Sequence, residues 1–507
     1  MVLPITGSAT PGVHVGVNDS PVARPTQLET NSRLLAVGYS PWGPVNQPVN
    51  ITGFEDYRRQ FGGLHANSAL GDAMYIFFNV FPGDRAVVVR VVGAAAAVAT
   101  KTVKDRGADE AEDDTLRIDA KYPSSSVDVR FKIEAGTDAN TVRLTVWSNT
   151  LDLMESYNNL KMDAASLARV NAASKLVKLT DLASANVAPA NLPDITAETV
   201  LVGGSDDFAG LSDASFIGAG AGTADATGLQ VLNSEEFGPG QVALPGVTTN
   251  AAHAALEAHG LAYHRVPLHD AAEGLDKDEV KDVRDAITFG ALHWPRVEML
   301  DFAGSGVRKF YPTSAFAAGA CAKADAIGVF KAPAGLTGLI PGALGIETYS
   351  TGLAQMDDNT RAFLNENQIN AIVPFRGQGI RIYGERLISP DSRVQMIHEI
   401  RTLNYLYYQL KASLQSLPFQ TIDGSGRLFR EAKSVCESIC RQLWGAGGLY
   451  GKTEEEAFLV VCDEQNNPAE SLDQQVLNVK VDVRISPTAE RVNVSLNQQP
   501  LTVKLAA

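Results

Sequence analysis

The chain has 507 residues, of which 45% are hydrophobic and 20% charged. This composition is typical of a soluble globular protein that is too long for a single core, so two or three domains are expected. The formal net charge is −15, from 43 basic and 58 acidic residues. No run of lysine and arginine interrupts this acidity, and we therefore expect no nucleic-acid partner.

The N-terminal region has no charged segment followed by an apolar stretch, and its first basic residue is Arg24. The sequence therefore predicts no secretory signal. The most apolar window, residues 86–100, is interrupted by Arg90 and Gly93 and is shorter than the roughly 20 residues of a membrane span. We expect the chain to be made and folded in a cytoplasm and not to insert into a membrane.

Residues 1–20 are predicted to form an arm. Val13, Val15 and Val17 alternate with His14 and Gly16, and this period of two is typical of one half-buried strand. Prolines and glycines on both sides separate the strand from any core of its own. An isolated strand leaves its backbone groups unpaired, so it has to pair with another part of this chain or with another molecule.

Residues 21–95 and 205–350 are predicted to form one α/β domain. Its first part contains a buried strand at residues 34–44 that ends in a Pro/Gly turn, a buried strand at residues 86–93, and an apolar helix at residues 71–81 that stops at Pro82. Its second part contains three predicted helices and three strands. These are the helices at 251–260, 276–289 and 314–326 and the strands at 241–246, 261–268 and 295–302.

Residues 96–204 are predicted to be a mixed α+β domain inserted into the α/β domain. Residues 94–111 are rich in alanine and then charged, which suits a linker, and residues 115–148 alternate in the manner of antiparallel strands. The α/β pattern resumes after Gly203 and Gly204, which indicates an insertion instead of a separate domain.

Residues 351–489 are predicted to form an α+β domain, and residues 490–507 a second arm. Two strands at residues 364–388 precede a helix that is expected to begin at Ser389-Pro390, and a second helix covers residues 427–444. A strand with alternating apolar side chains follows, formed by Val479, Val481, Val483 and Ile485. The terminal arm repeats this alternation at Val492, Val494 and Leu496 and again at Leu501, Val503 and Leu505.

Several segments resemble those of contractile tail sheath proteins, in the same order along the chain. The resemblance rests on LNENQINAIVPFRGQGIRIYGERLI, WGAGGLYGKTEEEAFLVVCDEQNNP and VKVDVRISPTAERVNVSLNQ, with TPGVHV, FFNVFPGDRAVVVRV, LVGGSDD and GVFKAPAG before them. It is weakest in the predicted insertion. The sequence departs from the family at Tyr383 and Glu385, where the family usually has tryptophan and alanine.

The resemblance implies a structural subunit and no enzyme. Family members stack in hexameric rings around an inner tube, and contraction of the sheath drives the tube through a target cell envelope. The α/β domain would have a subtilisin-like topology without a catalytic triad, and no cofactor or metal is implied. The partners would be other copies of the chain, the inner tube protein, and baseplate and terminator or cap proteins.

The resemblance also implies a use for the arms, which would add strands to the C-terminal sheets of neighbouring subunits. The acceptor would be the strand that carries Val479, Val481, Val483 and Ile485, since an open sheet edge can pair with an added strand. The residue pattern alone favours pairing of both arms within their own chain, and the resemblance reverses this preference. In the family, a helix of the C-terminal domain contacts the tube through charge. The hypothesis for that helix here is residues 427–444, with the cations Arg427, Arg430, Lys433 and Arg441; a solvated polar face is the alternative.

Two further functions are considered besides the sheath. One is a non-contractile surface or capsid-like assembly protein. The other is a degenerate subtilisin-like hydrolase, for which Asp206 or Asp207 and His253 come in the expected order. A nucleophile turn is missing, because Ser305 and Ser425 both lie in loop-like sequences.

Other chemical motifs are incomplete. GLYGKT at residues 448–453 resembles the end of a phosphate-binding loop, but Ala446 occupies the position of the required glycine and a helix precedes the motif. Cys436 and Cys440 share one face of a predicted helix without a nearby histidine, and we interpret all four cysteines, including Cys321 and Cys462, as buried thiols. The eight histidines are scattered and form no HExxH pair.

Overall fold

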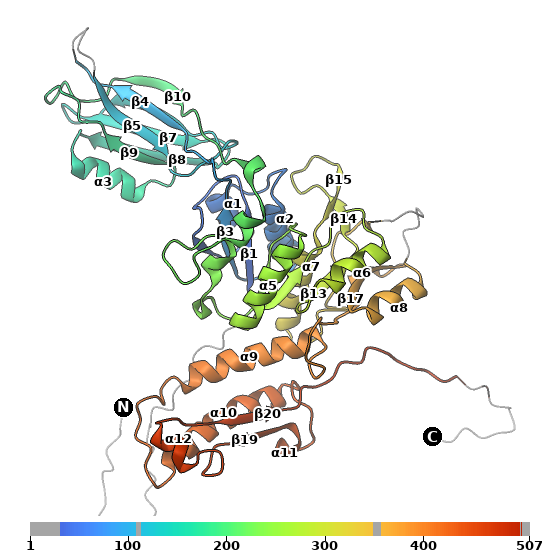
Figure 1. Cartoon of the computed structure of the whole chain (residues 1–507). Helices are drawn as coiled ribbons and strands as arrows, with labels where there is room; N and C mark the ends of the chain where they lie inside the picture. Colours follow the sequence, from blue (N-terminus) through green and yellow to red (C-terminus); the bar gives the residue numbers. More distant parts are fainter. Residues whose placement is uncertain (1–30, 108–112, 348–355, 497, 499–507) are drawn as a thin grey trace, which may run out of the picture.

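The structure is a computed structural model, and it describes residues 31–107, 113–347, 356–496 and 498. A mostly parallel eight-stranded sheet forms the centre of the molecule (Figure 1). Its strand order across the sheet is β18 (Gly379–Ile382), β17 (Ile369–Phe375), β13 (Ala291–Trp294), β12 (Val266–His269), β11 (Gln241–Ala243), β1 (Leu34–Tyr39), β3 (Ala86–Val91) and β2 (Pro48–Ile51). The two edge strands, β18 and β2, run antiparallel to their neighbours.

Both faces of the central sheet are covered, which explains why its strands are continuous apolar runs. In β1, Leu34 and Ala36 belong to the core on one face, and Leu35 and Val37 to the core on the other. The helices on the first face include α1 (Phe54–Phe61), α2 (Ala69–Tyr75), which continues as a π-helical turn (Ile76–Val80), and α7 (Thr313–Asp325). The opposite face carries α5 (Asn250–Tyr263), α6 (Lys277–Asp285) and α8 (Asp358–Glu366).

A hairpin and several short helices complete the central body. The hairpin consists of β14 (Val297–Leu300) and β15 (Arg308–Tyr311), and β14 also pairs with β16 (Gly345–Ile346). The short helices lie between residues 208 and 237: three 3₁₀ turns (Phe208–Gly210, Gly228–Leu232, Glu235–Phe237) and α4 (Asp213–Ile217).

The segment between β3 and residue 205 forms a second body with its own apolar core (Figure 1). One sheet has the order β10 (Thr196–Val200), β6 (Arg130–Ala135), β7 (Val142–Ser148) and β8 (Leu153–Leu160). The other consists of β4 (Thr100–Lys104), β5 (Asp114–Ala120) and β9 (Val177–Asp181), with α3 (Ala164–Ala173) beside it. The strand β4 lies inside residues 94–111, so the prediction of a linker there is wrong for residues 100–104.

The C-terminal part is a third body, built on two long helices. These are α9 (Ile397–Leu414) and α10 (Arg427–Gly445), which pack with α11 (Glu454–Ala457), β19 (Phe458–Val461), α12 (Ala469–Asp473) and β20 (Lys480–Val483). The helix α9 begins at Ile397 and not at Ser389, because Arg386 forms a β-bridge with Met396 that keeps the intervening residues out of the helix.

The boundary predicted at residue 351 lies too early in the chain. The strands β17 and β18 follow it, yet β17 pairs with β13 and extends the central sheet. The structure therefore changes from the central body to the third body near the start of α9. Among the described helices, none is long and apolar enough to cross a membrane.

Candidate assembly site

The third body presents a two-stranded sheet, β19 and β20, whose register places Val460 opposite Val481 and Phe458 opposite Val483. No third strand pairs with it among the described residues. The side chains of Val481 and Val483 pack against the apolar core of this body, whereas Lys480 and Asp482 are exposed on its other face. This is the strand predicted as an acceptor, and the flanking Val479 and Ile485 also pack against the core.

The hydrogen bonds show which edge of β20 is open. The N–H of Arg484 donates to the carbonyl of Ala457 at 2.9 Å, and the carbonyl of Arg484 accepts from the N–H of Tyr450 at 2.8 Å. Backbone groups of an antiparallel pair point alternately toward and away from the partner strand. The N–H and C=O groups of Val481 and Val483 therefore point away from β19, toward an edge that no other described strand covers.

Part of the C-terminal arm is described, and its apolar side chains are exposed. Val492, Val494 and Leu496 have exposed fractions of 79%, 82% and 94%, and their backbone belongs to no helix or strand. Burial of such side chains would contribute at most about 1.5–3 kcal/mol each. The remaining arm residues named above lie outside the described residues: Val13, Val15, Val17, Leu501, Val503 and Leu505.

The helix α10 is strongly amphipathic. Its buried face consists of Leu428, Phe429, Ala432, Cys436, Cys440 and Leu443. On the other side, Arg427, Arg430 and Arg441 are exposed and Lys433 is half-exposed. Arg441 is engaged in a two-pronged ion pair with Glu454 at 2.7 and 2.9 Å, and Lys433 lies 3.9 Å from Glu437. Arg430 donates to the backbone carbonyl of Ser425, and within the described residues neither Arg427 nor Arg430 forms an ion pair.

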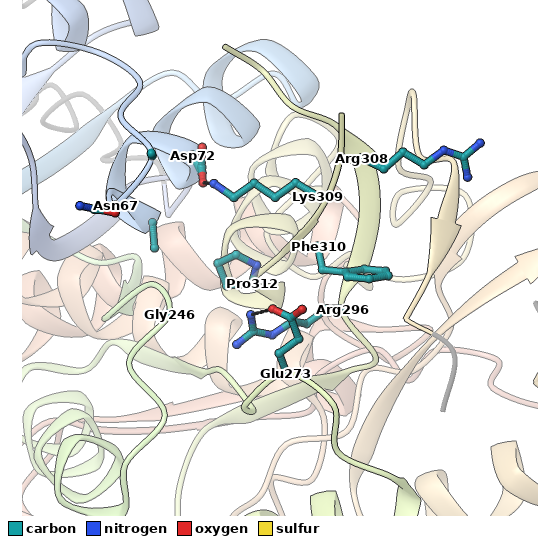
Figure 2. A pocket seen from close by; sticks show the side chains of 11 residues that line it. Asn67, Asp72, Gly246, Glu273, Arg296, Arg308, Lys309, Phe310 and Pro312 are labelled. Atoms are coloured by element: carbon teal, nitrogen blue, oxygen red, sulfur yellow. Dashed lines mark hydrogen bonds and ion pairs between the residues drawn. The ribbon is translucent and has the colours of Figure 1, made fainter. Parts of the chain in front are cut away.

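A cleft of about 430 Å³ lies in the central body (Figure 2). Gly246, Glu273 and Arg296 line it, and each follows the carboxyl end of one parallel strand: β11, β12 and β13. The chain runs from β1 to β3 on one side of the sheet and from β11 to β13 on the other, so β1 and β11 flank a switch point of the topology. Ligands of open α/β sheets bind at such points, so this cleft is the first candidate for a ligand-binding or catalytic site.

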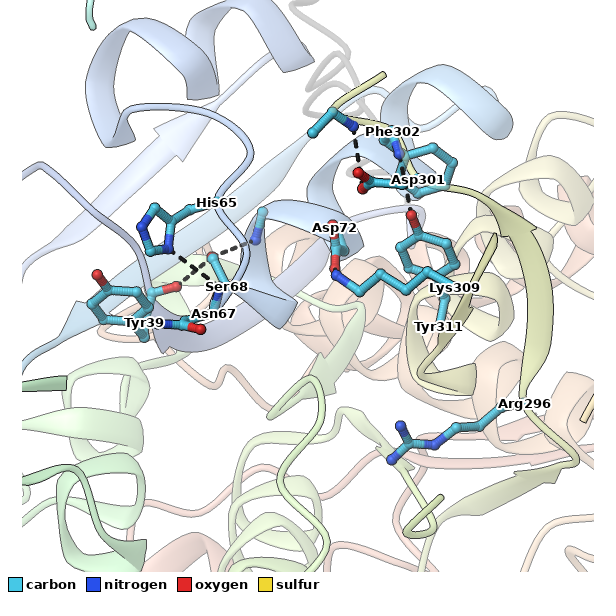
Figure 3. Close-up of polar contacts among 12 residues, drawn as sticks. Tyr39, His65, Asn67, Ser68, Asp72, Arg296, Asp301, Phe302, Lys309 and Tyr311 are labelled. Atoms are coloured by element: carbon cyan, nitrogen blue, oxygen red, sulfur yellow. Dashed lines mark hydrogen bonds and ion pairs between the residues drawn. The ribbon is translucent and has the colours of Figure 1, made fainter. Parts of the chain in front are cut away.

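The charges around the cleft neutralise one another. Figure 3 shows the side chain of Lys309 pointing toward Asp72, and the distance between Nζ and Oδ2 is 2.5 Å. Arg296 lies 3.4 Å from Glu273 and also donates to a backbone carbonyl. Burial raises the pKa of Asp72 to about 6, although Lys309 acts in the opposite direction. Ser68 caps α2, accepting from the N–H of Gly71 and donating to a backbone carbonyl, so its hydroxyl is not poised as a nucleophile.

The residues considered for a hydrolase are not assembled into a triad. Asp206 accepts hydrogen bonds from Tyr39 and Ser125, whereas Nε2 of His253 lies 3.1 Å from the backbone carbonyl of Asp270. A general base needs a hydroxyl on one ring nitrogen and an orienting group on the other. Asp207 contacts the backbone at Ala95, and the carboxylate of Asp270 accepts from Ser314 and Thr313, which makes it a structural cap.

The four cysteines are buried and unpaired. Burial raises the pKa of Cys321, Cys436 and Cys440 to about 11, so their thiols stay protonated and unreactive near neutral pH. Among the residues that the structure describes, no group of three His, Cys, Asp or Glu side chains is placed to hold a metal ion.

Solved structures of contractile sheath proteins share this fold. The contracted helical sheath of the anti-feeding prophage matches 97% of this chain and 100% of its own, at 17% identity and a TM-score of 0.55. The contracted PVC sheath of an extracellular contractile injection system matches over 97% and 99%, at 15% identity and 0.54. The sheath tail protein of Listeria innocua covers 87% of this chain and 90% of its own, at 14% identity and 0.58.

The sequence itself matches no protein-family model, and no curated protein matches it significantly. The likeness is therefore one of fold. It extends over nearly the whole chain, which agrees with the predicted resemblance to tail sheath proteins.

Proposed function

We propose that this chain is the structural subunit of a contractile tail sheath, which polymerises around an inner tube and contracts to drive the tube through a target cell envelope. The observation that carries the proposal is the full-length match to solved sheath subunits, including the inserted body and the C-terminal body. The cleft with its paired charges offers no rival chemistry, and a hydrolase is not supported by the positions of Asp206 and His253. The free energy for contraction would be stored in contacts between subunits, without nucleotide hydrolysis by this chain.

In this proposal the terminal arms connect neighbouring subunits by adding strands to the β19–β20 sheet. The open edge of β20 supplies unpaired N–H and C=O groups at Val481 and Val483, and the exposed Val492, Val494 and Leu496 supply apolar side chains at the matching period of two. A strand of about six residues would form several hydrogen bonds, each worth about 0.5–1.5 kcal/mol. Such a connection is strong enough to hold while subunits move relative to one another.

The other proposed partners are the inner tube protein, baseplate proteins and terminator or cap proteins. Assembly would take place in the cytoplasm of a bacterial host, and the assembled sheath would be part of a virion tail or a released contractile particle. The topology of the central body would be that of subtilisin without its triad, and the inserted body would face outward.

Negative-stain electron microscopy of the purified full-length chain tests the proposal. Ordered hollow cylinders are the expected result, because sheath subunits can polymerise without the rest of the particle. Dispersed monomers at high protein concentration, or activity on an esterase substrate, would contradict it. Deletion of residues 490–507 tests the arms separately, since cylinders should then be lost while the subunit remains folded.

The exposed side of α10 is proposed to contact the tube. Reversal of charge at Arg430 and Lys433 should abolish co-assembly with the tube protein, whereas the melting temperature of the subunit should change little, because neither side chain contributes to the buried face. The matched control is reversal of charge at Lys101 and Lys178, two exposed lysines of the inserted body, which should leave co-assembly unchanged. Unchanged co-assembly of the Arg430 and Lys433 variant would exclude this helix as the contact.

A further inference from the structure

The C-terminal segment does not leave the molecule directly from β20. After β20 it runs back toward the start of α9 and only then departs (Figure 1). On this path the hydroxyl of Thr488 donates to the carboxylate of Glu385, and the guanidinium of Arg386 lies 2.6 Å from the carboxylate of Glu490. Two adjacent residues of the central body thus hold two positions of the segment, about one hundred residues later in the chain.

Glu385 is itself held on three sides. Its side chain is 6% exposed, and Oε2 lies 2.9 Å from Nδ1 of His398 in the first turn of α9. Its backbone carbonyl accepts from the N–H of Ile397 at 2.9 Å. Glu385 therefore connects three parts of the molecule: the end of the central sheet, the first turn of α9 and the segment that contains Thr488.

Arg386 is fixed in the same way. Asn370 in β17, which is fully buried, accepts from the N–H of Arg386 at 2.6 Å and donates to its carbonyl at 2.8 Å. The guanidinium also donates to Asn365 at 3.0 Å, which leaves its other end for Glu490. Arg386 is thus positioned by β17 of the central sheet, and Glu385 by the first turn of α9.

We infer that Glu385 and Arg386 are positioning residues that fix the direction in which the C-terminal arm leaves the subunit. We call these two contacts, Thr488 with Glu385 and Glu490 with Arg386, the fastening. Because Thr488 lies four residues before Val492, the fastening sets where the exposed apolar stretch of Val492, Val494 and Leu496 begins. Tension on the arm would also be transmitted directly to the central body, without passing through the β19–β20 sheet. The inference rests on the proposed function only in assigning the arm a partner.

Limited digestion of the soluble subunit with trypsin tests the fastening without any assembly. Trypsin has to bind the chain on both sides of Arg491, so local release of the segment from Thr488 to Glu490 should speed cleavage there. Cleavage after Arg484 requires opening of the sheet, because the backbone of Arg484 is bonded to Ala457 and Tyr450. The two sites therefore report local release and unfolding of the third body in the same sample.

We expect Thr488→Val, which keeps the shape and removes the hydroxyl, to speed cleavage after Arg491 about tenfold, since a hydrogen bond to a buried carboxylate is lost. Thr488→Ser, the matched control, should be cleaved at the wild-type rate, and cleavage after Arg484 should not change in either variant. In cylinder formation, Thr488→Val should raise the protein concentration required, and Thr488→Ser should not.

An unchanged rate after Arg491 in Thr488→Val would overturn the inference, as would an equal increase at Arg484, which would show general unfolding. If the wild-type chain forms no cylinders but the digestion gives the expected pattern, the sheath proposal fails while the fastening stands. If cylinders form equally well with Thr488→Val despite faster cleavage, the segment is held as described but its direction is irrelevant to assembly, and the inference is wrong.

Discussion

Replacing Val481 with proline should disable the open edge of β20 while leaving the subunit folded. The N–H of Val481 points away from β19, so proline removes no bond of the β19–β20 ladder, and edge strands tolerate proline for this reason. An arriving strand would lose one hydrogen bond, worth about 0.5–1.5 kcal/mol. The proline ring would also prevent the arriving strand from burying one apolar side chain, and that burial is worth about 1.5–3 kcal/mol. The sum, about 3 kcal/mol, is on the order of 100-fold in the association constant.

The matched control is proline at Asp482, one residue further along β20. Its N–H points toward β19, so Asp482→Pro breaks the ladder and should lower the melting temperature. Sedimentation and negative-stain microscopy would measure assembly, and circular dichroism would measure melting. Two results would refute the reasoning: cylinders of Val481→Pro at the wild-type concentration, or an equal loss of melting temperature in both variants.

Two further predictions concern the buried ionisable groups. Burial lowers the pKa of His259, His269 and His293 to about 3. Below pH 6.5 the unfolded chain therefore binds protons at these histidines that the folded chain does not bind. At pH 5 this lowers the free energy of unfolding by about 2 kcal/mol per histidine. Asp72, whose pKa is raised to about 6, acts in the opposite direction and offsets roughly 1 kcal/mol of this loss. Urea unfolding should therefore give a free energy of unfolding about 4–5 kcal/mol lower at pH 5 than at pH 7. Equal values at the two pH values would contradict the lowered pKa of the three histidines. Lys309→Met should destabilise the subunit by about 1–3 kcal/mol at pH 8, because the buried Asp72 carboxylate loses its partner, and by less at pH 5, where that carboxyl is protonated. A cost that does not vary with pH would show that the methylene chain of Lys309, and not its charge, is what matters.

The central sheet is the part of the fold that the sequence predicts best. The runs LLAVGY and AVVVRV are apolar throughout because both faces of β1 and β3 are covered by helices, and a strand buried on both faces leaves this mark locally. The start of α9 was not predictable in the same way. Ser389-Pro390 is a good helix start, but the pairing of Arg386 with Met396 competes with it, and that pairing depends on the position of β18 and not on local sequence.

The polar contacts that define the sites are less visible in the sequence. Asp72 and Lys309 are 237 residues apart, and they meet because the hairpin of β14 and β15 packs against α2, where Phe302 stacks on Tyr75. Glu385 and Thr488 are separated by 103 residues. The acceptor strand, by contrast, was predictable as a strand because Val481 and Val483 alternate with charged residues, and its open edge became visible only with the register of β19.

The contacts of α9 indicate where movement between subunits would have to be accommodated. Arg401, which is fully buried, pairs with Asp325 and donates to the carbonyl of Cys321 in α7 at 3.0 Å. Two turns later the hydroxyl of Tyr408 donates to the carbonyl of Tyr263 at 2.8 Å, at the end of α5. A helix attached to the central body at both places cannot swing about a single hinge without breaking a buried ion pair, which costs about 3–5 kcal/mol. In the proposed contraction, the third body would turn together with the central body, and the displacement between neighbouring subunits would fall on the arms beyond Thr488.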